Sequence, residues 1–129
     1  MATRMASRLE RFFEGRTNGN LRSIVKYDGD SYDIIYLRED VANQYSEPEI
    51  ESAIDDSRFS SLSVPIYEDI YSDDHGDLTC MVQCFENVIE MNFVLEDGVG
   101  AAVALDEEAF TETQGIVAKA REIVLEERE

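Results

Sequence analysis

Positive charge is scarce in this sequence. Eleven Lys and Arg residues stand against 29 Asp and Glu residues in 129 positions, and only two of the cations are Lys. The formal net charge is −18 at pH 7 and the sequence pI is about 4.2. Because affinity for nucleic acid depends on Lys and Arg that neutralise phosphates, this balance disfavours a nucleic-acid partner.

The sequence also has no long apolar segment. No apolar run approaches the ~20 residues that a membrane-spanning helix needs. The positive charge near Met1 is not followed by an apolar core, so we expect no signal peptide. Cysteine is rare as well: Cys80 and Cys84 lie in a predicted strand with Cα atoms ~13 Å apart, too far for a disulfide. We expect two buried thiols in a reducing cytoplasm.

The surplus of acidic residues indicates that the protein works in concentrated salt. A compact body with so much like charge repels itself, and molar salt screens that repulsion because the Debye length falls to ~3 Å. Acid in place of Lys therefore predicts a cytoplasmic protein of a salt-in halophile, an archaeon. The apolar fraction is 43%, ordinary for a globular domain, so the acid belongs to a folded surface and not to a disordered chain.

Hydrophobic periodicity predicts one α+β domain over residues 1–129, with the element order α-β-β-α-β-β-β-α. An amphipathic helix is expected over residues 1–17. A hairpin follows, in which strands over 21–27 and 32–37 are joined by an Asp-Gly turn at 28–30. Residues 38–74 are expected to be helical in pieces, with a capping box at Ser46 and Glu49 and a second short helix beginning near Pro65.

Three more strands are expected over 78–85, 88–95 and 99–105, before a terminal helix over 106–129 that frays from 125. In the second of these strands the alternation places Glu90 and Asn92 toward water. It places four apolar residues toward the core, namely Ile89, Met91, Phe93 and Leu95. The third strand carries unusually small residues at 100–102, which often let a helix or another backbone come close.

This order resembles the roadblock/dynein light-chain-7 domain, a member of the profilin-like group. The features that match are the helix with Leu9-Glu10-Arg11-Phe12-Phe13, the hairpin turn at Asp28-Gly29-Asp30, and the meander with turns at Glu86-Asn87 and Glu96-Asp97-Gly98. The break at Pro65 departs from the single long central helix of that family. The chain also looks like small acidic haloarchaeal proteins of unknown function.

The resemblance implies a five-stranded antiparallel sheet with helices on both faces, and a non-enzymatic role. Roadblock domains form homodimers or heterodimers and regulate or scaffold P-loop NTPases, above all small GTPases. On that basis we expect a homodimeric interaction module without a membrane span. We expect its interface on a sheet edge or on the central helix, at residues that could equally belong to the core: Ile50, Ile54, Tyr67 and Tyr71.

Two other functions stay open. The profilin-like group also includes longin, PAS and GAF domains, which can hold a small ligand. That function predicts a solvent-filled pocket of several hundred Å³ between sheet and central helix, near Cys80, Cys84 and Phe93, whereas a tightly packed interior favours the interaction module. A transcription-linked role would use the basic stripe of Arg4, Arg8 and Arg11, whose other explanation is pairing with the protein's own acids.

No pattern in the sequence predicts an enzyme. His75 is the only histidine, and it lies in the acidic segment Asp73 to Asp77, which lacks the EF-hand spacing and a second zinc ligand. We expect a solvated loop there, with cation binding left open. The acidic pairs elsewhere are expected to be solvated surface. We therefore expect no catalytic residue, no cofactor and no metal.

Overall fold

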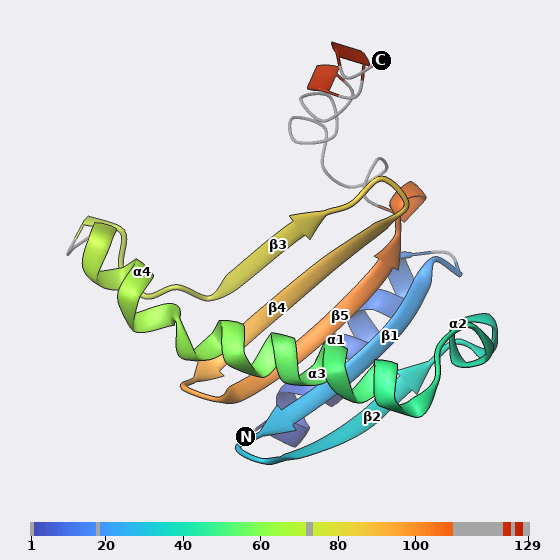
Figure 1. Ribbon diagram of the computed structural model, residues 1–129, viewed down its shortest axis with the longest axis horizontal. Coiled ribbons are helices and arrows are strands. Elements are labelled where there is room, and N and C mark those ends of the chain that lie inside the picture. Colours follow the sequence, from blue (N-terminus) through green and yellow to red (C-terminus); the bar gives the residue numbers. More distant parts are fainter. Residues whose placement is uncertain (1, 18, 72–73, 110–122, 125, 128–129) are drawn as a thin grey trace.

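Five antiparallel strands form the centre of the fold, in the order β2-β1-β5-β4-β3. The computed structural model describes residues 2–17, 19–71, 74–109, 123–124 and 126–127 (Figure 1). This sheet confirms the predicted fold class, α+β with a five-stranded antiparallel sheet. Within the described residues, no helix has both the length and the hydrophobicity required to cross a bilayer.

The first half of the chain forms a helix and a hairpin. Helix α1 (Ala2–Arg16) is followed by β1 (Leu21–Asp28) and β2 (Ser31–Leu37). Asp28 pairs with Ser31, and Gly29 adopts a φ of 61° in the tight turn between them. A positive φ costs glycine little because it has no Cβ, which explains why the Asp-Gly signal marks this turn.

Three helices connect the hairpin to the rest of the sheet: α2 (Glu39–Gln44), α3 (Glu47–Leu62) and α4 (Val64–Tyr71). The start of α3 is the predicted capping box, since the backbone N–H of Ser46 donates to Glu49 Oε1 at 2.9 Å and the backbone N–H of Glu49 donates to Ser46 Oγ at 3.3 Å. Helix α3 ends before Pro65, as expected, because proline removes a backbone donor.

A meander completes the sheet: β3 (Cys80–Cys84), β4 (Val88–Glu96) and β5 (Val99–Asp106). Strand β5 pairs with both β1 and β4 and so joins the hairpin to the meander. A helix begins at Glu107 and continues through Ala109. Most of the predicted terminal helix over 106–129, including Phe110, lies outside the described residues.

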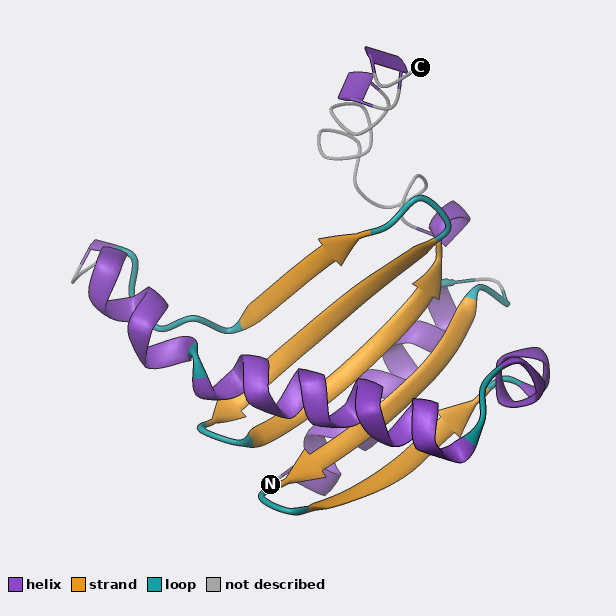
Figure 2. Cartoon of the chain, in the orientation of Figure 1, coloured by secondary structure: helices purple, strands orange, loops and turns teal. Residues whose placement is uncertain are grey.

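Helices α1 and α3 lie on opposite faces of the sheet (Figure 2). The face beneath α1 is an apolar core whose fully or nearly buried members come from α1, β1, β4, β5 and the helical turn after β5: Phe13, Leu21, Ile24, Ile89, Val103, Leu105 and Ala109. The rings of Phe13 and Phe93 meet there, with centroids 6.2 Å apart. This face therefore carries most of the hydrophobic stabilisation.

The cysteines differ from each other. Both are free; Cys80 is half-buried, but Cys84 is exposed, so the expectation of two buried thiols is wrong for Cys84. The reason is position: β3 is an edge strand, whereas α1 packs against β1, β5 and β2 at the other side of the sheet. Burial raises the pKa of the Cys80 thiol above its ordinary value.

Candidate functional sites on the α3 face

Small residues form the floor beneath α3. Gly100, Ala102 and Ala104 alternate along the central strand β5 on the face opposite the apolar core. A Cβ atom placed on Gly100 would lie 2.3 Å from the Phe93 carbonyl oxygen and 2.6 Å from Tyr27 Oη. The glycine therefore leaves the space through which the Tyr27 ring passes, so the small residues of this strand do accommodate a close neighbour.

Hydrogen bonds, together with the buried side chain of Ile54, hold α3 to this floor. The wholly buried Tyr27 donates its hydroxyl to Asn92 Oδ1 at 2.5 Å, and Asn92 Nδ2 donates to the Ser57 carbonyl of α3 at 2.8 Å. Nearer the end of the helix, the backbone N–H of Gly98 donates to the buried Ser61 hydroxyl at 3.2 Å. Burial raises the pKa of Tyr27, and its hydrogen bonds oppose that rise.

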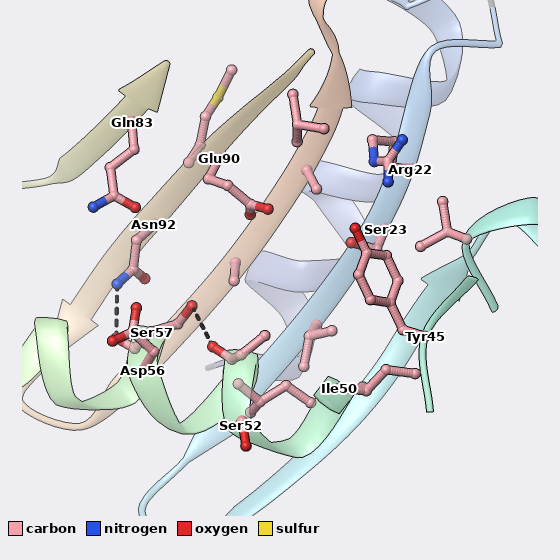
Figure 3. A pocket seen from close by; sticks show the side chains of 18 of the residues that line it. Arg22, Ser23, Tyr45, Ile50, Ser52, Asp56, Ser57, Gln83, Glu90 and Asn92 are labelled. Carbon is pink, nitrogen blue, oxygen red and sulfur yellow. Dashed lines mark hydrogen bonds between the residues drawn. The ribbon is translucent and has the colours of Figure 1, made fainter. Parts of the chain in front are cut away.

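Beside α3 the sheet is open, and a groove of about 860 Å³ lies between the helix and the strands (Figure 3). Figure 3 places Gln83, Glu90 and Asn92 on one side of the groove and Arg22 and Tyr45 on the other. The floor includes Ser23, Val25, Ala102 and Ala104, and the walls include α3 and the β3–β4 turn. A volume of this size falls in the range of sites for small organic ligands.

Glu90 occupies the floor of this groove. It pairs across the strands with Gln83 on β3 and with Ala104 on β5, and it is half-buried. No ion pair in the described part of the chain includes Glu90. Burial raises the pKa of Glu90 above the ordinary glutamate value, and the nearby positive charge of Arg22 opposes that rise.

Arg22 takes part in a charged network at the end of the groove. Its guanidinium donates to Asp106 Oδ1 at 3.2 Å and to Gln44 Oε1 at 3.5 Å. Arg38 makes two hydrogen bonds to the same Asp106 carboxylate, at 2.6 and 3.1 Å. The hydrogen bonds from Arg38, and to a smaller extent the one from Arg22, hold the pKa of Asp106 below its usual range. Arg22, the one cation among the described residues that line the groove, is therefore paired with Asp106.

A second candidate site is apolar and lies where α3 gives way to α4. Five large side chains there are 46–66% exposed, at helical spacing along the two helices: Phe59, Leu62, Ile66, Tyr67 and Ile70. We call them the α3–α4 apolar surface. The chain entering β3 is tied to α4, since the backbone N–H of Leu78 donates to Glu68 Oε2 at 2.7 Å. In the described residues β3 pairs only with β4, so its outer edge is open beside this surface.

The predicted interface residues separate in the structure. Ile54 is only 5% exposed, so it is a core residue and not an interface residue, the alternative that the sequence left open for all four positions. Ile50 is partly buried and lines the groove. Tyr67 is exposed on the α3–α4 apolar surface, whereas Tyr71 ends α4 and its side chain lies outside the described part.

The basic stripe lies on α1, far from both sites. Arg4, Arg8 and Arg11 are exposed, and none of the ion pairs of the described residues includes them. Pairing with the protein's own acids is therefore not seen. The described chain is a five-stranded sheet and not the winged or helix-turn-helix shape that a transcription-linked role would require.

The His75 loop is exposed and lies beside α4 and β3, where it borders a shallow depression with Tyr67 and Glu68. Among the described residues, no three His, Cys, Asp or Glu side chains gather closely enough to hold a metal ion. Asp73, one member of the predicted acidic loop, lies outside the description.

Two residues of the groove were assigned wrongly from the sequence. Glu90 and Asn92 were expected to face water, but Asn92 is buried beneath α3 and Glu90 is half-buried in the groove. Strand alternation correctly separated them from the apolar side of β4, yet it carries no information on what covers the other side. The signal that could have identified them is the row of small residues on the neighbouring strand, which indicates an element close above this face.

Family comparison accounts for nearly the whole chain. Residues 7–125 match the model of a family described as a domain of unknown function, DUF7522. No curated protein and no solved structure matches the chain.

Proposed function

The chain belongs to the DUF7522 family, and we propose that it acts as a non-enzymatic interaction module that dimerises through the α3–α4 apolar surface and the edge of β3. The observation that carries this proposal is the set of five large apolar side chains, 46–66% exposed, in a chain of net charge −18. Several large apolar side chains exposed on neighbouring helices of a highly charged protein are typical of interaction sites.

A second copy of the chain is the partner that we propose, because one strand edge carries no charge to oppose its approach. Two bodies of charge −18 repel each other except where acid is missing, and the segment Leu78 to Cys84 contains no charged residue. An edge strand without charge also lacks the usual protection against pairing with another strand. The resemblance to roadblock domains, which form dimers, is in keeping with this arrangement.

Light scattering in 2 M KCl tests the dimer. We expect the mass of two chains for the wild type and of one chain for the double variant Ile66→Glu/Ile70→Glu, which places charge on the apolar surface. Phe12→Glu is the matched control, since Phe12 is 51% exposed on α1, on the other face of the sheet, and this variant should stay dimeric. A monomeric wild type at ~100 μM would overturn the proposal, because stable interfaces bind well below that concentration. Recovery of a stoichiometric P-loop NTPase with a monomeric chain would instead assign the surface to a different partner.

The groove supports a second function, the binding of a small molecule. A solvent-filled space of several hundred Å³ was the condition for that function, and the groove has about 860 Å³. Its position differs from the expectation: Phe93 belongs to the α1 side, and Cys80 and Cys84 pair with residues of that side, Phe93 and Ile89. The dimer would use the outer edge of β3, and Gln83 of the same strand also lines the groove, so the two functions share this strand. Native mass spectrometry of the purified protein tests the second, because a bound small molecule adds its mass to that of the chain.

We also propose that the protein works in the cytoplasm of a halophile. The support is compositional, 29 acids against two Lys, since salt screens the self-repulsion of such a surface. We expect far-UV circular dichroism to show a folded chain in 2 M KCl and loss of structure on dilution to ~0.1 M. An unchanged spectrum and melting temperature at low salt would contradict this proposal.

A further inference from the structure

We propose that the α3-face groove binds an organic cation, a protonated primary or secondary amine on an apolar body, with the ammonium group paired to Glu90. This inference deepens the second function proposed above, the binding of a small molecule, and it does not depend on dimerisation.

The first step is the position of Glu90. Two neighbouring acids, Glu86 in the β3–β4 turn and Glu96 at the end of β4, are exposed, whereas Glu90 stands in mid-strand on the groove floor and is half-buried. Its cross-strand neighbours are the amide of Gln83 and the methyl group of Ala104. The half-buried Glu90 carboxylate has lost part of its hydration and has not gained a salt bridge. A cationic ligand would therefore replace the favourable electrostatic interaction with water that burial removed.

The second step is the charge of the groove. Among the described residues that line it, the carboxylates are Glu49, Asp56, Glu86 and Glu90, and the one cation is Arg22. The Arg22 guanidinium donates to Asp106 and Gln44, so its charge acts on Glu90 without a direct ion pair. Charge complementarity therefore favours a cation over an anion in this groove.

The third step separates an organic cation from a metal ion. In the described part of the chain no three His, Cys, Asp or Glu side chains converge, as a protein site for a metal would need. Much of the groove lining is instead apolar, and it includes Val25, Ile34, Val41, Ile50 and Tyr45. A half-buried carboxylate in a largely apolar lining matches a ligand that carries an ammonium group on a hydrocarbon or aromatic body.

The fourth step concerns the N–H groups of the ligand. Gln83 and the hydroxyls of Ser57 and Ser60 line the groove and can accept hydrogen bonds from an ammonium group that also pairs with Glu90. Asn92 is not counted among these acceptors, because its side-chain oxygen already accepts a hydrogen bond from Tyr27 and its side-chain NH₂ donates to the Ser57 carbonyl of α3. Acceptors beside a carboxylate favour an amine that carries N–H over a quaternary ammonium, which has none.

Three probes of equal shape test this assignment: 3-phenylpropylammonium, the neutral 3-phenylpropanol and the anionic 3-phenylpropanoate. Each is titrated into ¹⁵N-labelled protein in 1 M KCl, and the amide shifts are followed by NMR. We expect the ammonium probe to shift the amides of Gln83, Glu90 and Ala104, and to bind about tenfold or more tightly than the alcohol, as a charge-assisted hydrogen bond would give.

Variants assign the effect to one carboxylate. Glu90→Gln keeps the shape and removes the charge, and it should weaken the ammonium probe about tenfold while leaving the alcohol unchanged. Glu96→Gln is the matched control, since it removes an exposed acid from the same strand. The amide spectrum of each variant reports directly that it is folded.

The outcomes separate this inference from the function on which it rests. Binding of all three probes with equal affinity at the groove amides would keep the ligand site and overturn the choice of a cation. The same would follow if Glu90→Gln bound the ammonium probe as tightly as the wild type. The absence of shifts at the groove amides with any probe up to ~10 mM would overturn both, since a weaker affinity would not be specific. None of these results bears on the dimer.

Discussion

The two faces of the sheet are built from the same strands by opposite means. On β5 the residues toward α1 are Ala101, Val103 and Leu105, whereas those toward α3 are Gly100, Ala102 and Ala104. The α1 face is a packed apolar core, and the α3 face has a small-residue floor, a few buried hydrogen bonds and an open groove. The comparison teaches that one face supplies stability, which leaves the other face free to stay partly uncovered.

The largest expected effect comes from truncating the α1 face. Ile24 is fully buried, so Ile24→Ala should lower the free energy of unfolding by about 2–5 kcal/mol through lost burial and the cavity left behind. The matched variant on the other face is Ile50→Ala, where a partly buried side chain lines the groove, and we expect a loss below ~1 kcal/mol. Urea denaturation in 2 M KCl measures both. Equal losses would mean that the two faces contribute alike.

Adding one methyl group to the α3 face should cost about 1–3 kcal/mol. In Gly100→Ala the new Cβ meets the Phe93 carbonyl oxygen and the Tyr27 ring, and the backbone oxygen cannot move aside cheaply. Gly15→Ala is the control, because no heavy atom lies within 4 Å of the added methyl and alanine favours a helix. Thermal unfolding should show a lower melting temperature for the first variant only, and a neutral Gly100→Ala would contradict the close contact.

The hydrogen bonds beneath α3 are tested by Tyr27→Phe. This change leaves the buried Asn92 oxygen without its hydroxyl donor, and we expect a loss of about 1–2 kcal/mol. Amide hydrogen exchange should be faster in α3 than in α1, because the tyrosine supports the asparagine that holds α3. Tyr36→Phe, on the α1 face, removes a hydroxyl that makes no hydrogen bond to the described residues and should change stability by only a few tenths of a kcal/mol. Equal hydrogen-exchange rates in α1 and α3 of the variant would contradict the idea that the Tyr27–Asn92 hydrogen bond helps to hold α3 on the sheet.

The smallest effect is a gain of stability from Glu90→Gln. Burial raises the pKa of Glu90 in the folded state, so the stability that goes with the protonated form is complete below the unfolded pKa of ~4.3 and is lost as the pH rises through the folded pKa. The glutamine variant should therefore be more stable than the wild type at pH 7, and the difference should shrink as the pH falls toward 4. Urea midpoints at several pH values measure this trend, with exposed Glu96→Gln as the control. A variant less stable than the wild type at pH 7 would show that the carboxylate has a favourable partner.

Much of the fold could be predicted because its signals are local. The Asp28-Gly29 turn, the capping box of Ser46 and Glu49 and the stop before Pro65 depend on residues within a few positions of each other. The assignment of Cys84 and of the groove residues failed for the opposite reason. Whether Cys84, Glu90 or Asn92 meets water depends on where α1 and α3 cross the sheet, and those contacts join residues far apart in the chain.

The sequence by itself determined the acidic surface, the antiparallel strands and the separation of each strand into two sides, because charge, turn geometry and side-chain alternation are properties of short segments. Only the tertiary structure decided that one side is packed and the other open. Helix α3 is held through Asn92 and Ser61 over a floor of small side chains, and it covers only part of that floor. The groove and the half-buried Glu90 within it follow from that placement, which no local pattern specifies.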